Sequence, residues 1–302
     1  MKKIPYLLLC AFHLWACSST RSINSSVIRI KGSDTMIVLA GLWAEEYMQR
    51  HPGISIYVDG GGTAVGIEAL IKGEIEICTA SRPLRPSEVQ RLVKRYNNLG
   101  IAFLVARDAL SIYLHPDNPV RNLSLEQVKG IFTGSITNWQ TVGGKNESIL
   151  VFSRSPNSGT FLYFQEHVLH GEPYGKNVVP MPTTAAIVEI VTQQPRAIGY
   201  GGIAYGASLV HCPINGVSPT EENVRKEMYP IARYLYFYTI DKPRGTVKAF
   251  IDWVLSKAGQ KVVKKIGYIP LFEISASSSF LDSEGDASNT AAKLKAFSSG
   301  RF

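Results

Sequence analysis

Three short turns rich in hydroxyl side chains hold the residues of this sequence that could do chemistry. They are Ser33-Asp34-Thr35, Gly61-Gly62-Thr63 and Ser158-Gly159-Thr160, and a helical pattern follows each one. The first N–H groups of a helix lack partners inside it, and the helix dipole places partial positive charge there. Hydroxyl groups add donors, and glycine lets the main chain approach a ligand closely. N-capping would explain any one turn alone, but the three together predict a site for a tetrahedral oxyanion.

Two charged residues refine this prediction. Arg154 lies four residues before Ser158, and its planar guanidinium can bind two oxygens of an oxyanion at once. Asp34 is unexpected there because a carboxylate repels full negative charge. It suits a ligand that carries a proton, as phosphate does at neutral pH and sulfate does not. Spacing alone leaves two alternatives open, namely a surface arginine and an ordinary N-cap.

The known catalytic patterns do not match. The glycines at 61–66 lack the Lys-Ser/Thr pair of a phosphate-binding P-loop, and no G-x-S-x-G motif occurs. His167 and His170 lack the glutamate of a zinc-protease motif, and no nucleophile with a base or metal cluster can be assembled. The sequence therefore predicts a binding protein rather than an enzyme, with no cofactor and no metal.

Repeated strand, turn and helix patterns must position these residues. Residues 27–31, 54–58 and 76–79 are predicted strands, and a polar turn follows each of them. The helix after the first turn carries Leu39, Ala40, Trp43 and Tyr47 on one face. Such alternation is typical of a parallel sheet with crossover helices, in which ligands lie at the carboxyl ends of the strands.

The pattern continues through the rest of the chain. A helix is predicted from Ser124 and another after Gly159, and an amphipathic helix spans 247–255. Further strands are predicted at 109–114, 150–152, 197–200 and 235–239.

Composition sets broad limits. The 302 residues suffice for two compact domains, and 45% hydrophobic with 19% charged residues describe an ordinary globular protein. The formal charge of +8 suits an anionic partner. Because basic and acidic residues are mixed along the chain, nucleic-acid binding is not expected.

The first residues predict export. Lys2 and Lys3 precede an apolar run at 4–14 that is too short to span a bilayer. The run ends in Leu14-Trp15-Ala16-Cys17, which resembles the bacterial lipobox. That resemblance implies a lipoprotein signal peptide at 1–17 and a lipid on Cys17. A plain signal peptide cut nearby is the alternative.

The other two cysteines and the C-terminal tail carry less information. Cys78 and Cys212 could form a disulfide, but two buried free thiols are favoured. The Ser-rich residues 275–302 are predicted to be a flexible tail.

Motifs spread along the chain resemble the PstS-like phosphate-binding proteins of bacterial ABC importers. They include Ile30-Lys31-Gly32-Ser33-Asp34-Thr35-Met36, Gly60-Gly61-Gly62-Thr63, Ala80-Ser81-Arg82, Ile131-Phe132-Thr133-Gly134, Ser153-Arg154, Ser158-Gly159-Thr160, Ala197-Ile198-Gly199-Tyr200 and Gly267-Tyr268-Ile269-Pro270-Leu271. Together they run in family order from about 28 to 271.

The resemblance implies an α/β, two-lobed periplasmic-binding-protein fold with the ligand in the interlobe cleft. Lobe I would combine 27–106 with 234–274, and lobe II would span 107–233. The implied phosphate-binding residues are Ser33, Asp34, Thr35, Thr63, Ser81, Arg82, Arg154, Ser158, Gly159 and Thr160.

The chain departs from the family pattern at two positions. Many members have Ser-Gly after the glycine run, where this sequence has Thr63-Ala64-Val65, so that turn is the least secure contact. Some members have Asp at the position of Arg82. The arginine would either add charge to the site or pair with Asp34.

The function implied is capture of inorganic phosphate and its delivery to the permease subunits of an ABC importer. The protein would lie at the periplasmic or extracellular face of the cytoplasmic membrane, anchored by the lipid on Cys17. The alternatives are the same fold binding sulfate or molybdate, and a secreted phosphatase or a surface adhesin.

Overall fold

The computed structural model describes residues 26–274. The predicted signal peptide with Cys17 and the predicted tail at 275–302 lie outside the described residues.

One mixed sheet runs through the whole described chain. Within 26–274 it has nine strands in the order β2-β1-β3-β9-β4-β7-β5-β6, with β8 paired to β4. The strands are β1 Ser26–Gly32, β2 Ile54–Asp59, β3 Ile77–Ala80, β4 Ile101–Leu114, β5 Leu150–Arg154, β6 Val178–Met181, β7 Ala197–Gly202, β8 Val210–Cys212 and β9 Ala232–Thr239.

Helices cover both parts of this sheet. They are α1 Ile37–Arg50, α2 Thr63–Lys72, α3 Pro86–Tyr96, α4 Leu125–Thr133, α5 Gly159–His167, α6 Thr184–Gln193, α7 Glu221–Arg225, α8 Gly245–Leu255 and α9 Lys257–Lys265, with short 3-10 helices at Asp34–Met36 and Trp139–Val142. None of the helices in this part of the chain is long and apolar enough to cross a membrane.

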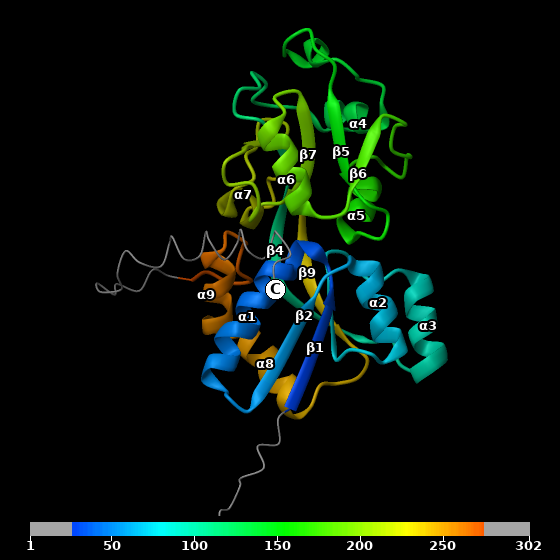
Figure 1. The fold of residues 1–302 in the computed structure, drawn as a ribbon, viewed down its shortest axis with the longest axis vertical. Helices are drawn as coiled ribbons and strands as arrows, with labels where there is room; N and C mark the ends of the chain where they lie inside the picture. Colours follow the sequence, from blue (N-terminus) through cyan, green and yellow to red (C-terminus); the bar gives the residue numbers. More distant parts are fainter. Residues whose placement is uncertain (1–25, 275–302) are drawn as a thin grey trace, which may run out of the picture.

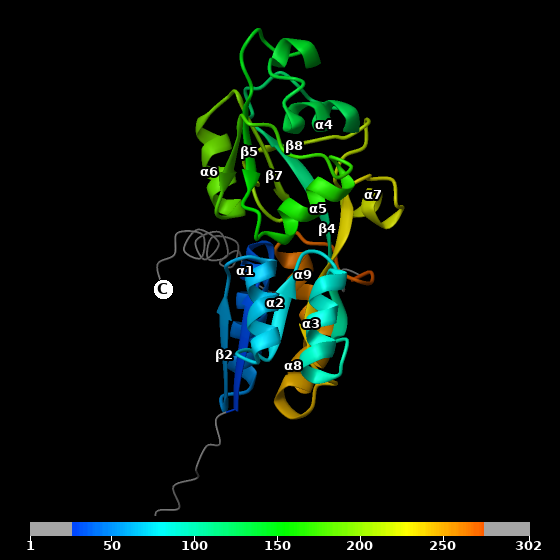
Figure 2. The same cartoon turned by 90° about the vertical axis from the view of Figure 1, so that its right-hand side faces the viewer.

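The elements gather into two lobes stacked along the long axis (Figures 1 and 2). Lobe I contains β1–β3, α1–α3, α8 and α9, and lobe II contains β5–β8 and α4–α7. Each lobe has its own buried core, one around Trp43 and Phe250 and the other around Phe132, Phe164 and Tyr200. The predicted α/β, two-lobed fold is confirmed.

Strands β4 and β9 join the lobes. They pair antiparallel from Ile101–Thr239 to Ala109–Ala232, and β4 then pairs antiparallel with β7 from Leu110 onward. The predicted strand at 109–114 is therefore only the second half of β4. Arg107 and Asp108 interrupt the apolar pattern, which concealed the continuous strand.

Local sequence accounts for most elements. The predicted face of α1 is buried, and Trp43 Nε1 donates a hydrogen bond of 2.8 Å to the carbonyl of Gly259 in α9.

Parallel pairs occur within each lobe, β1 with β2 and β3, and β5 with β6 and β7. The strands that connect the lobes are antiparallel, so the expectation of a parallel sheet holds only inside the lobes.

The two cysteines of the described chain are free and buried, as favoured from the sequence. Burial raises the pKa of both thiols, that of Cys212 to about 12. Both are therefore protonated at neutral pH.

We predict that Trp43→Ala lowers the free energy of unfolding by about 3–5 kcal/mol, because it leaves a cavity in the core of lobe I and removes the bond to Gly259. Urea denaturation followed by circular dichroism measures this change. Tyr57→Ala is the control, since Tyr57 is 64% exposed and its loss is expected to stay within about 0.5 kcal/mol. Equal losses for the two variants would contradict this packing.

Candidate oxyanion-binding site

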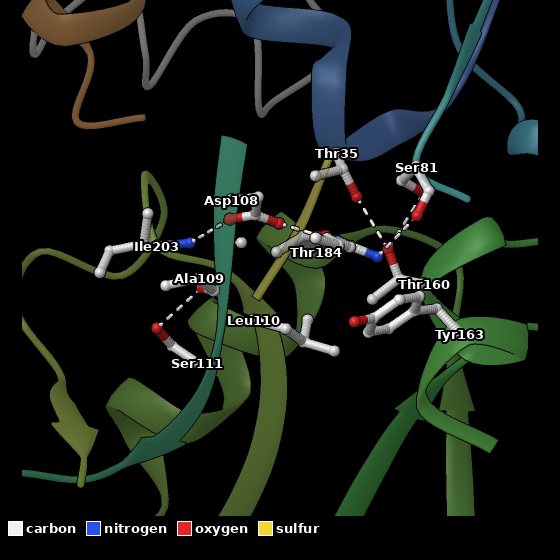
Figure 3. A network of polar contacts seen from close by, with 12 residues as sticks. Thr35, Ser81, Asp108, Ala109, Leu110, Ser111, Thr160, Tyr163, Thr184 and Ile203 are labelled. Carbon is white, nitrogen blue, oxygen red and sulfur yellow. Dashed lines mark hydrogen bonds and ion pairs between the residues drawn. The ribbon is translucent and has the colours of Figure 1, made fainter. Parts of the chain in front are cut away.

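Hydroxyl groups from both lobes meet at one buried point between them (Figure 3). Thr160 Oγ1, from lobe II, lies 2.9 Å from Thr35 Oγ1 and 3.4 Å from Ser81 Oγ, both from lobe I. Thr63 Oγ1 lies 3.4 Å from Ser81 Oγ and also accepts a hydrogen bond from the Ser81 N–H. All four side chains are buried. The predicted turns are thus brought together, although they lie up to 125 residues apart in the sequence.

The end of β1 positions the first turn. Ser33 N donates to the carbonyl and to the hydroxyl of Thr79, at 3.0 and 2.8 Å. Gly32 has φ of +147°, and a Cβ there would lie 2.1 Å from the Thr79 carbonyl oxygen, so only glycine fits. Residues 34–36 then form a 3-10 turn before α1 begins. The side chains of Asp34 and Thr35 are consequently held at the lobe boundary.

The glycine run allows the second turn to contact lobe II closely. A Cβ on Gly62 would lie 2.8 Å from the carbonyl oxygen of Asn157. That carbonyl accepts a hydrogen bond from Ala64 N, and Asn157 Nδ2 donates to the carbonyl of Gly61. The turn Thr63-Ala64-Val65 differs from the family pattern, but it still places Thr63 in the hydroxyl cluster.

The third turn begins α5. Ser158 caps this helix and accepts a hydrogen bond from Thr160 N. A Cβ on Gly159 would lie 2.4 Å from Thr63 Oγ1 and 2.7 Å from Ser81 Oγ. A side chain at 159 would therefore force the lobes apart.

An ion pair joins the lobes beside these hydroxyls. Arg154 Nη2 donates to Asp34 Oδ2 at 2.7 Å, and the arginine side chain is only 1% exposed. Arg154 also donates to Thr184 Oγ1 and to the carbonyl of Pro182. Its buried Nε has no hydrogen-bond partner among the described residues. The alternative of a surface arginine is therefore wrong.

The Asp34 carboxylate has a further partner, the Gly61 N–H, which donates to Oδ1 at 2.9 Å. The side chain thus bridges the first turn, the glycine run and Arg154, whereas an ordinary N-cap would bond within its own helix. The site offers a carboxylate acceptor among many donors. That combination suits an oxyanion bearing one proton.

Arg82 lies next to this cluster but has another partner. Its guanidinium donates to both carboxylate oxygens of Glu88 at 2.7 and 2.8 Å, and to the carbonyl of Pro83. Burial alone would raise the pKa of Glu88, but hydrogen bonds from Arg82 and from the Arg85 N–H lower it. Of the two alternatives for Arg82, pairing with Asp34 is wrong, because Glu88 in the first turn of α3 lies against Arg82 and Arg154 reaches Asp34 from lobe II.

Several supporting residues were not predicted from the sequence. Tyr205 and Tyr268 donate to the carbonyls of Asp34 and Thr35, and the tyrosines gave no local signal. Thr184 could be predicted from the sequence, because Thr183-Thr184 places a hydroxyl cap at the start of α6, as in the three predicted turns. Among residues 26–274 no group of three His, Cys, Asp or Glu side chains could hold a metal ion.

Comparison with known proteins identifies the family. The PBP superfamily domain matches residues 19–258. The chain is 34% identical over 263 residues to the phosphate-binding protein PstS of Pseudomonas aeruginosa, covering 80% of this chain and 81% of that protein. PstS of Bacillus subtilis is 30% identical over 256 residues, covering 83% and 82%.

A solved structure supports the same family. It is a Clostridium perfringens protein assigned as a phosphate ABC transporter substrate-binding protein, with bound phosphate. It superposes with a TM-score of 0.76 and 31% identity, covering 82% of this chain and 100% of that one. With its two lobes and its interlobe site, this chain belongs to the PstS-like phosphate-binding proteins of the PBP superfamily.

Proposed function

We propose that this protein captures inorganic phosphate outside the cytoplasm and delivers it to the permease of an ABC importer. The observation that carries the proposal is the Asp34–Arg154 pair, which joins a buried arginine of lobe II to a partly buried aspartate of lobe I beside the hydroxyl cluster. Family membership supports it, because the PstS relatives are phosphate-binding proteins.

The chemistry of the site matches phosphate closely. Arg154 and the hydroxyls of Thr35, Ser81 and Thr160 donate to oxyanion oxygens, while the Asp34 carboxylate accepts the proton of a P–OH group. A buried arginine N–H without a partner is unusual, so Arg154 Nε is a further donor for the ligand. Micromolar binding requires about 8 kcal/mol, which a few hydrogen bonds to charged groups at ~1.5–3 kcal/mol each supply.

The remaining predicted residues belong to the same proposal. Thr63 lies in the hydroxyl cluster, Ser158 and Gly159 lie beside it at the start of α5, and Ser33 precedes Asp34 at the end of β1. Arg82 follows Ser81 in the chain and its charge is paired with Glu88, so its buried Nε, which lacks a partner among the described residues, is its remaining donor. The proposal is binding without catalysis.

The proposal includes lipid anchoring and movement of the lobes. The lipobox-like Leu14-Trp15-Ala16-Cys17 supports acylation of Cys17 after removal of the signal peptide. Separate hydrophobic cores support lobes that move as bodies about β4 and β9, with 27–106 plus 234–274 in one and 107–233 in the other. Such hinge closure is common in periplasmic binding proteins.

The choice of anion tests the proposed function. Isothermal titration calorimetry at neutral pH should show phosphate binding in the micromolar range or tighter, and far weaker binding of sulfate and molybdate. The reason is that these dianions lack the proton that Asp34 accepts. Tight sulfate binding without phosphate binding would refute the phosphate assignment.

Truncation of Arg154 tests the donor side of the site. Arg154→Met should weaken phosphate binding roughly 30-fold to several-thousand-fold, because truncating a buried charge partner costs ~2–5 kcal/mol. Calorimetry measures the dissociation constant. Arg196→Met is the matched control in lobe II, where the arginine contacts Ser148 away from the site, and its affinity should equal that of the wild type. Unchanged affinity in Arg154→Met would mean that the site is misplaced.

Substitution of Asp34 tests the acceptor side of the site. Asp34→Asn should lower the ratio of phosphate to sulfate affinity at least about tenfold, since an amide donates to a dianion and removes the repulsion of the carboxylate. Competition titrations with both anions give this ratio. Asp252→Asn, at an exposed position of α8, serves as the control and should leave the ratio unchanged. An Asp34→Asn variant with wild-type discrimination would rule out the proton-acceptor role.

A further inference from the structure

A second buried ion pair lies on the strands that join the lobes. Arg233 of β9 donates from Nε and Nη2 to Asp108 Oδ2 of β4, at 3.0 and 2.9 Å. The two residues face each other in the β4–β9 register, and their side chains are 2% and 0% exposed. Burying two charges costs free energy unless further hydrogen bonds complete the pair. The remaining partners of this pair are therefore informative.

In lobe I the pair reaches the oxyanion site. Arg233 Nη1 donates to the carbonyl of Ser81 at 3.1 Å. The hydroxyl and the N–H of this same residue take part in the buried cluster with Thr63 and Thr160. Arg233 consequently fixes the main chain from which the Ser81 hydroxyl projects.

In lobe II the pair reaches α5. The Arg233 guanidinium lies over the Tyr163 ring, 5.4 Å from its centroid. Tyr163 follows Thr160 by one helical turn, and its hydroxyl donates to the carbonyl of Ala232 in β9 at 2.8 Å. These contacts hold the helix that presents Gly159 and Thr160.

Asp108 adds another link to lobe II. Its Oδ1 accepts a hydrogen bond of 2.9 Å from Ile203 N, just after β7 (Figure 3). A Cβ on Gly202 would lie 3.1 Å from the same oxygen and 2.9 Å from the Tyr268 hydroxyl. Glycine at 202 thus leaves room for the carboxylate.

We propose that Asp108 and Arg233 are positioning residues that couple the connecting strands to the phosphate site, without themselves contacting the ligand. Rotation of the lobes about β4 and β9 must distort the contact with Ser81 or the contacts with α5. The pair therefore favours the closed arrangement, and apparent affinity rises with the population of that arrangement. This inference rests on the proposed function and deepens it.

The geometry explains why arginine is needed at 233. The planar fork uses Nε and Nη2 for Asp108, Nη1 for Ser81 and its face for Tyr163. A lysine ammonium is a point charge and cannot make this set of contacts. By contrast, the buried Arg82–Glu88 pair lies wholly within lobe I and cannot couple the lobes.

The test measures phosphate affinity and lobe closure together in the full mature protein. Arg233→Met and Arg233→Lys should each weaken phosphate binding about 5- to 30-fold by calorimetry. Small-angle X-ray scattering should show that both variants need correspondingly more phosphate to reach the compact form. Asp108→Asn should weaken phosphate binding to a similar extent. Its side-chain NH₂ group is a donor and cannot accept hydrogen bonds from the Arg233 guanidinium.

A control separates positioning from simple stability. Trp139→Phe in lobe II also destabilises the protein, because it removes the 2.9 Å hydrogen bond from Trp139 Nε1 to the carbonyl of Arg196. That bond involves neither connecting strand nor the site, so this variant should bind phosphate with wild-type affinity. Arg233→Lys and Asp108→Asn keep the test decisive if Arg233→Met does not fold. Wild-type affinity and closure in the folded variants would overturn this inference alone. Failure of the wild type to bind phosphate would instead overturn the proposed function.

Discussion

The Asp34–Arg154 ion pair is the interaction on which the arrangement of this protein depends, because its two charges come from different lobes, with Arg154 buried and Asp34 largely shielded from water. A buried arginine needs partners in every direction that its donors face. Thr184 and Pro182 satisfy part of this need within lobe II, and Asp34 satisfies another part across the boundary. The pair thereby sets the chemistry of the cleft. It supplies one strong donor group and one acceptor, which is the polarity of a partly protonated oxyanion.

Close approach of the lobes is the second requirement, and small residues meet it. The glycines at 62 and 159 lie where a Cβ would strike the opposite lobe, and Asn157 bonds to the main chain around the first of them. Three hydroxyl side chains can then meet within hydrogen-bond distance. The two departures from the family pattern, at Thr63-Ala64-Val65 and at Arg82, are compatible with this close approach. Thr63 retains a hydroxyl at the right place, and Arg82 lies against Glu88 instead of Asp34.

Connection of the lobes through β4 and β9 links hinge and site. Both strands pass from one hydrophobic core toward the other, and their antiparallel ladder is continuous apart from an irregularity between Leu104 and Ala106. A charge pair in the middle of such a ladder is costly, yet its partners extend to Ser81 in lobe I and to α5 in lobe II. Recognition of the anion and the geometry of the hinge are thus connected through one set of hydrogen bonds.

The amino-acid sequence by itself determined the three hydroxyl turns, most of the strands around them, the buried face of α1 and the family. These are local properties, since capping residues, glycines and apolar periodicity act over a few positions. It also favoured the two free thiols. Only the tertiary structure decided which charge pairs with which. Arg82 and Arg154 are chemically alike and both lie near site turns, but Glu88 lies six residues from Arg82 whereas Asp34 is 120 residues from Arg154. The same holds for Asp108 and Arg233, whose charges obscured a strand in the sequence because their compensation comes from 125 residues away.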